Sequence, residues 1–169
     1  MEDNMKKFKI RQAGPEEITL LADIIKKSFQ DVAVRFGLTK ETAPRHASNC
    51  ETDWIKKDME RGMTYFLLEE ENFACGCVAC EIIDNSLCYL ERLAVLPQKS
   101  KRGFGGALVN HIFNTAKQSG ARKVSIGIIS AQAELKRWYE KIGFIETHTK
   151  KFEHLPFVVS FMSYDLDKN

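Results

Sequence analysis

The chain lacks any apolar run near the ~20 residues that a membrane-spanning helix needs. Its first residues are charged and contain no apolar secretory core, so we expect a cytoplasmic protein that does not contact a membrane. The formal net charge is only +2, too small to indicate binding to nucleic acid. With 169 residues and 44% hydrophobic content, the sequence predicts one globular domain over residues 1–169.

A disulfide framework and a metal site are also not expected. The five cysteines are odd in number and no secretory signal precedes them. Zinc sites use two close pairs of ligands, and only Cys77 and Cys80 have such a spacing. We therefore expect the cysteines to be small apolar core residues in a reduced protein.

Two common phosphate-binding loops are missing as well. No Gly-Lys-Ser/Thr triplet is present, which excludes a Walker loop. Gly103 and Gly105 could begin a dinucleotide fingerprint, but Leu108 stands where its third glycine belongs. A nicotinamide- or flavin-dependent oxidoreductase is therefore disfavoured.

The most informative stretch is residues 90–111, which reads LERLAVLPQKSKRGFGGALVNH. An apolar strand leads through Pro97 and a basic turn into glycines and then an apolar helix. The first N–H groups of a helix have no partner within it, and the helix dipole adds positive charge at the same end. This order predicts an anion site that suits a phosphate-bearing cofactor, to which Lys99, Lys101 and Arg102 add full charges.

Hydrophobic periodicity predicts an α/β protein with a mixed sheet and helices on both faces. Residues 31–49 read as an irregular connection, and Asn49 or Thr52 is expected to cap the second helix. The predicted strands are 8–12, 64–68, 73–83, 87–95, 123–129, 144–152 and 158–166, and the predicted helices begin near 15, 52, 104 and 132.

The pattern resembles the GNAT family of acetyl-CoA-dependent N-acetyltransferases, and two blocks carry the resemblance. Residues 93–97 followed by 100–108 are similar to the family's cofactor motif, with Ser100 where the family usually has Gln or Arg. Residues 138–144, WYEKIGF, resemble the family's Tyr-Glu-Lys-x-Gly-Phe helix end. The resemblance implies a GNAT-like fold, a central mixed seven-stranded sheet with about four helices.

The resemblance also implies acetyl-CoA as the acetyl donor. Its pantetheine arm is expected along the exposed edge of the strand and its pyrophosphate on the glycine turn. Gln132 stands where many members have Asn, and its amide is expected to reach the cofactor. The expected cofactor-binding residues are Leu93, Ala94, Val95, Ser100, Lys101, Arg102, Gly103, Phe104, Gly105, Gly106, Ala107 and Gln132.

For the chemistry, Tyr139 matches the family's general acid, and the Val95 N–H is the expected donor to the thioester oxygen. Glu91 is the first candidate for the base and Glu81 the second. Strict alternation would place Glu91, Leu93 and Val95 on one face and Arg92 on the other.

The predicted reaction is direct attack of a primary amine on the thioester. The acceptor is a small molecule or, as an open alternative, a peptide or protein amine, and His46 and His154 are candidates for lining its pocket. A homodimer is possible. The alternative function is a non-catalytic module that binds acyl-CoA, and Tyr139 argues against it.

Overall fold

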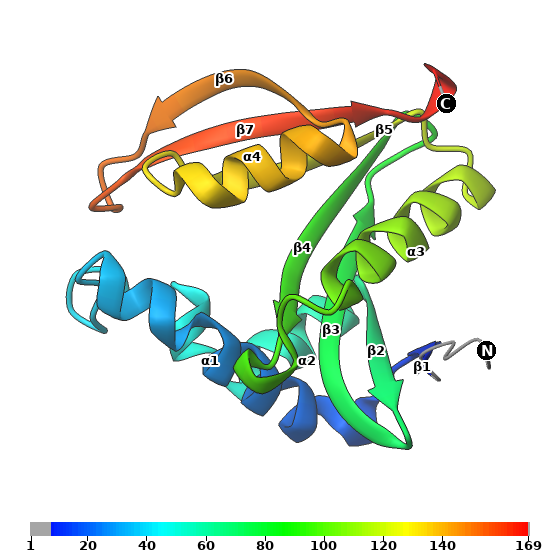
Figure 1. Cartoon of the computed structure of the whole chain (residues 1–169), viewed down its shortest axis with the longest axis horizontal. Coiled ribbons are helices and arrows are strands. Elements are labelled where there is room, and N and C mark those ends of the chain that lie inside the picture. Colours follow the sequence, from blue (N-terminus) through cyan, green and yellow to red (C-terminus); the bar gives the residue numbers. More distant parts are fainter. Residues whose placement is uncertain (1–7, 169) are drawn as a thin grey trace, which may run out of the picture.

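The computed structural model describes residues 8–168 and places seven strands in one mixed sheet with α-helices on both faces (Figure 1). The strand order is β1-β2-β3-β4-β5-β7-β6, and only β4 and β5 are parallel neighbours. The strands are β1 (Phe8–Gln12), β2 (Thr64–Glu70), β3 (Phe73–Ile82), β4 (Leu87–Val95), β5 (Lys123–Ile129), β6 (Ile145–Lys151) and β7 (Val158–Asp165). The α-helices are α1 (Ile18–Arg35), α2 (Thr52–Glu60), α3 (Phe104–Gln118) and α4 (Ala133–Ile142).

Most of the predicted elements are confirmed, and the differences lie at their ends. The helix α1 continues through Arg35 into the stretch expected to be irregular, and β2 continues to Glu70. The N-cap of α2 is Glu51, so neither residue proposed from the sequence caps it. Gln132 is the N-cap of α4, one residue before the helix begins.

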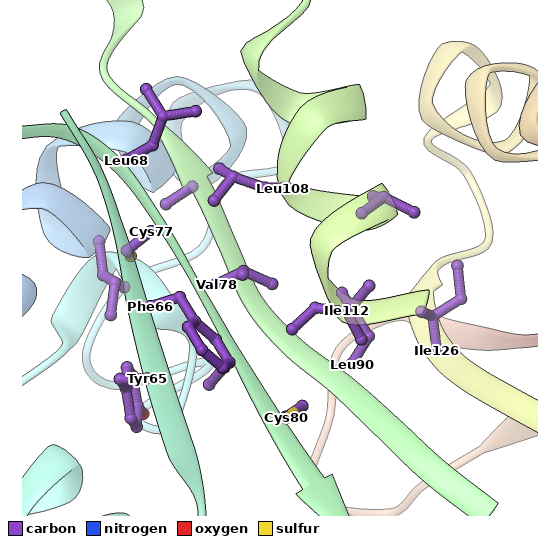
Figure 2. Packing of buried hydrophobic residues seen from close by; sticks show 14 of the residues in the cluster. Tyr65, Phe66, Leu68, Cys77, Val78, Cys80, Leu90, Leu108, Ile112 and Ile126 are labelled. Carbon is purple, nitrogen blue, oxygen red and sulfur yellow. The ribbon is translucent and has the colours of Figure 1, made fainter. Parts of the chain in front are cut away.

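The core lies between the sheet and the helices on each face. Figure 2 shows Leu108 and Ile112 of α3 above Val78 and Leu90, on the face opposite Tyr65 and Cys77. The helices α1 and α2 cover that opposite face, where Tyr65 reaches Asp58 of α2. All five cysteines are buried and free, as the sequence predicted. Within the described part of the chain, no helix is both long and apolar enough to cross a bilayer.

Two neighbouring parallel strands separate in the middle of the sheet. The pairing of β4 with β5 covers only Leu87–Tyr89 opposite Lys123–Ser125. Beyond these pairs β4 stays with β3, while β5 leaves with β7, and the two ribbons diverge (Figure 1). The edge of β4 that faces β5 is therefore without a strand partner from Leu90 onward.

A bulge in β4 accompanies this separation. The register with β3 shifts between the pairs Ala79–Glu91 and Cys77–Ala94, so that β4 has one extra residue there. Arg92 at the bulge has a φ of 55°, in the left-handed region that non-glycine residues rarely adopt. Its guanidinium lies 3.7 Å from the Asp58 carboxylate and 5.6 Å from the Trp54 ring centroid, and these contacts with α2 hold the bulge.

The N-terminal strand is fixed to the sheet by an ion-pair network around Arg11. Its guanidinium donates to Glu17 at 2.6 and 2.8 Å and to Glu69 at 2.8 and 3.1 Å. Hydrogen bonds from Arg11 hold the pKa values of both carboxyl groups below their usual range. The network stabilises the fold where both carboxyl groups are ionised in the folded protein.

We predict that Arg11→Met lowers the Tm at pH 7 by roughly 2–4 °C, which corresponds to about 1 kcal/mol for a chain of this size. Because the carboxyl pKa values are lowered on folding, the stabilisation is present above their ordinary values and is lost as the pH falls through the folded values. Thermal melts from pH 7 to pH 3 should therefore show the wild-type advantage disappear at the acid end.

The matched control is Lys27→Met, which removes an exposed pair with Asp23 and should change the Tm by less than 1 °C. An Arg11→Met deficit that stays constant down to pH 3 would contradict the electrostatic explanation.

Candidate active site

The glycine turn before α3 has the geometry of an anion site. Gly103 is the N-cap of α3 with a φ of 84°, a conformation that favours glycine. The first bond of the helix runs from the Ala107 N–H to the Gly103 carbonyl at 3.1 Å. The N–H groups of Gly105 and Gly106 precede this bond and have no acceptor within the helix. A Cβ added at Gly106 would meet nothing within 4 Å, so the turn is open there.

The charged side chains beside the turn are arranged differently from the sequence expectation. The Glu70 carboxylate accepts from Lys99 Nζ at 2.8 Å and from both terminal nitrogens of Arg102. One carboxylate thus offsets part of the positive charge and ties the turn to the end of β2. The Ser100 hydroxyl donates to the Pro97 carbonyl at 2.9 Å and so stabilises the turn itself.

The side chains of the turn divide between the core and the surface. Phe104 is buried, and its ring contacts that of Phe8 with centroids 5.6 Å apart. A Cβ on Gly105 would lie 3.3 Å from the Trp138 ring of α4, so any larger residue at this position would require that ring to shift. Lys101 is exposed and has a φ of 58°. Phe104 and Gly105 can therefore offer a ligand only their backbone.

The end of β4 presents backbone donors to the gap beside it. Leu96 N–H donates to the Cys75 carbonyl at 2.9 Å, which makes these two residues a hydrogen-bonded pair. In an antiparallel ladder such pairs alternate with pairs that do not exchange hydrogen bonds. The next pair, Val95 with Gly76, is of the second kind, so the Val95 N–H points away from β3, toward the side that β5 has left.

A cavity of about 860 Å³ lies where the two strands separate. Its walls come from α1, β4, β5, α4, β6 and β7. Of the residues predicted from the sequence, Glu91, Leu93, Gln132 and Tyr139 line it, whereas Ala94 and Val95 are not among the lining residues. The predicted acid, the predicted base and part of the predicted cofactor site are therefore brought to one space.

Burial raises the pKa of both titratable groups proposed for the chemistry. Tyr139 is only 4% exposed, and loss of solvation raises the pKa of its phenol well above the usual value of 10. Loss of solvation also raises the pKa of the half-buried Glu91 carboxyl, against a smaller opposing effect of Arg92. Tyr139 therefore retains its proton at neutral pH, and Glu91 binds a proton more readily than an exposed glutamate.

Strict alternation along β4 is wrong because of the bulge. Glu91 pairs with Ala79 and Ala94 with Cys77, and Ala79 and Cys77 lie two residues apart on one face of β3. Glu91 therefore shares its face with Ala94, and Val95 lies on the opposite face. Arg92 reaches Asp58 and Trp54 on the same side as Glu91, contrary to the expectation that it faces away.

Of the two histidines predicted to line the acceptor pocket, only one lines the cavity. His46 lines the cavity, whereas His154 is exposed in the loop before β7 and contacts the Phe152 ring. The sequence analysis did not identify His148, Phe157 or Phe161 as lining residues. In the sequence these residues appear only as aromatic and histidine residues in or near the last two strands. That pattern does not show that β6 and β7 lie opposite α1.

The family model "Acetyltransferase (GNAT) family" matches residues 23–144. The chain belongs to this family. A GNAT acetyltransferase is an acyltransferase that takes its acetyl group from acetyl-CoA, so the predictions of family, enzyme class and donor are confirmed. The match includes both sequence blocks and the strands on either side of the cavity.

Solved structures agree with the GNAT fold. The ribosomal-protein-S18-alanine N-acetyltransferase of Escherichia coli has a TM-score of 0.76 and 14% identity, with 94% of each chain covered. A putative acetyltransferase of Salmonella typhimurium, solved with acetyl-CoA, has a TM-score of 0.70 and 19% identity over 96% of each chain. The PaiA N-acetyltransferase of Thermoplasma acidophilum, solved with coenzyme A, has a TM-score of 0.72 and 15% identity, covering 94% of this chain and 99% of its own. A search of curated protein sequences finds no match to this GNAT chain.

We predict opposite stability effects for two glycine substitutions in the turn of this GNAT protein. Gly103→Ala should lower the Tm by roughly 2–4 °C, because a left-handed φ costs an L-residue about 1 kcal/mol. Gly106→Ala should leave the Tm unchanged or raise it, because the added methyl meets no atom and alanine favours the helix. Thermal melts of both variants check this, and equal losses would contradict the assigned backbone geometry.

Proposed function

We propose that this GNAT protein transfers the acetyl group of acetyl-CoA directly to a primary amine, with Glu91 and Tyr139 as its base and acid. The observation that supports this most is that both side chains line one cavity at the point where β4 and β5 separate. When bound, acetyl-CoA supplies an acetyl thioester whose carbonyl carbon can accept a nucleophile.

The residues fit this cofactor in three respects. The α3 turn offers the N–H groups of Gly105 and Gly106 to a pyrophosphate, with Lys101 exposed nearby. The edge of β4 has no strand partner and can pair with an extended chain that carries amide groups, as added strands do. Gln132, the N-cap of α4, and Leu135 of α4 line the cavity, and Trp138 of the same helix lies close to Gly105 of the α3 turn.

The backbone of β4 also supplies a donor for the thioester oxygen. The sequence predicted the Val95 N–H as this hydrogen-bond donor, but Val95 does not line the cavity. Leu93 does, and it directly follows Arg92 in the bulge, where the register of β4 with β3 is interrupted. We therefore assign the stabilising donor to the Leu93 N–H, which lies next to the bulge.

Proton transfer follows from the environments of the two side chains. An amine attacks only as the free base, and the Glu91 carboxylate accepts the ammonium proton directly or through water. Tyr139 keeps its proton until a thiolate leaves, because its phenol is buried and its pKa is raised. The phenol then donates its proton to the thiolate sulfur, and the thiol that forms has an ordinary pKa of about 8.5. The attacking nitrogen releases its second proton as the amide forms, and a proton from solvent restores the Tyr139 phenol.

We predict that Tyr139→Phe and Glu91→Gln each lower kcat by about 10²-fold or more, the usual contribution of a positioned acid or base. Binding of coenzyme A, measured by calorimetry, should change less than threefold in both. Thiol release from acetyl-CoA with a saturating amine gives kcat.

Two matched controls are available. Tyr164→Phe removes the hydroxyl of another tyrosine, which lies in β7 and stacks on Phe113 of α3. Glu81→Gln changes the second candidate base, whose carboxylate accepts a hydrogen bond from Arg61 at 3.3 Å. Neither residue lines the cavity, and both variants should keep kcat within threefold. A loss of kcat in Glu81→Gln with kcat retained in Glu91→Gln would transfer the base assignment to Glu81.

A further prediction concerns the binding of coenzyme A. Coenzyme A should raise the Tm and give a calorimetric signal with wild type. Gly106→Ala should weaken this binding at least fivefold without loss of folding, because its methyl stands at the open N-terminal turn. Tight binding without acceleration of thiol release by any amine would favour a non-catalytic acyl-CoA-binding module, and no binding would contradict both functions.

A further inference from the structure

The cavity reaches both faces of the sheet, and its two ends differ. On one face it is lined by Gln132, the N-cap of α4, and by Leu135 and Tyr139 of α4, the helix whose Trp138 lies close to Gly105 of the α3 turn. On the other face its walls come from α1 and from the β6–β7 pair, which lies across from α1 (Figure 1). If the donor follows the β4 edge from the α3 turn, as proposed above, the acceptor occupies the end between α1 and β7.

Aromatic and aliphatic side chains form the walls of this end. Phe29 of α1 meets the ring of His46 edge to face, with centroids 5.8 Å apart. Opposite, Phe161 of β7 stacks on His148 of β6 with centroids 4.7 Å apart and planes at 16°. Phe157 adds a third phenyl ring to the lining. Such walls favour a flat apolar group, which can stack on one ring and meet another at its edge.

Among the described residues that line the cavity, Glu91 is the only carboxylate. Arg92 also lines the cavity, but its guanidinium is already paired with the Asp58 carboxylate at 3.7 Å and lies 5.6 Å from the Trp54 ring centroid. His46 adds no charge at neutral pH, because burial lowers its pKa. Its Nδ1 accepts the Ser48 N–H at 3.3 Å, so the neutral ring carries its proton on Nε2.

One carboxylate can compensate one ammonium group. A second ammonium on the same acceptor would have to leave water for an apolar wall without a partner, which is strongly unfavourable. We propose, on the basis of the function proposed above, that the acceptor is a small primary amine with a single positive charge next to a ring-sized apolar group. The chemical class is an arylalkylamine rather than a polyamine, an aminoglycoside or a peptide N-terminus.

The first test compares acceptors with the wild-type protein. Thiol release from acetyl-CoA is measured with 2-phenylethylamine, spermidine and a short alanine-initiated peptide. The kcat/KM for 2-phenylethylamine should exceed both others at least tenfold. A higher value for spermidine or for the peptide overturns the inference but leaves the acetyltransferase function intact. No acceleration by any of the three, with coenzyme A bound, overturns the proposed function itself.

The second test changes the wall. Phe161→Ala should raise KM for 2-phenylethylamine at least fivefold, change KM for ethylamine less than twofold, and leave kcat within threefold. Phe29→Leu, on the opposite wall, should act in the same direction, which covers the case that Phe161→Ala folds poorly. The matched control is Phe73→Ala, which removes a phenyl ring that is 57% exposed at the β2–β3 turn and should alter neither KM. Equal changes for both amines, or none, would overturn the assignment of these rings to the acceptor.

Discussion

The separation of two parallel strands is the constraint on which the rest of this structure depends. β4 and β5 are joined by only three residue pairs, and everything proposed for the reaction lies beyond the last of them. An unpaired strand edge inside a protein leaves backbone N–H and C=O groups without partners, which is unfavourable unless a ligand or water satisfies them. This is why we propose that the open edge of β4 pairs with an extended, amide-bearing group.

The bulge in β4 adds a second constraint. Arg92 adopts a left-handed backbone conformation, and its side chain is held by α2 through Asp58 and Trp54. Asp58 in turn accepts a hydrogen bond of 2.5 Å from the buried Tyr65 hydroxyl. Because bulges redirect the side chains that follow them, this network decides that Glu91 and Val95 lie on opposite faces. The helix α2 therefore contributes to the cavity without lining it.

In the glycine turn before α3, the positively charged side chains hold the turn in place, while backbone N–H groups are available to bind an anion. Glu70 engages both Lys99 and Arg102, so these cations also fasten the turn to the β2–β3 hairpin. The N–H groups at the start of α3 do not depend on those side chains, because helix geometry alone leaves them without an acceptor in the helix. A turn held in this way presents its backbone donors in a fixed arrangement, which reduces the entropy lost on binding.

The sequence by itself determined the order of elements, the glycine turn before α3 and the two blocks that resemble the family, because periodicity, glycine and motif spacing act over short distances along the chain. It also proposed Tyr139 and Glu91 as acid and base, and both line the cavity, although the alternation used to orient Glu91 was wrong. Only the tertiary structure decided the bulge at Arg92, the pairing of Glu70 with the basic turn, and the wall formed by Phe29 and Phe161. Each of these depends on residues that are far apart in the chain and meet only when the sheet and helices pack, and local patterns contain no record of such contacts.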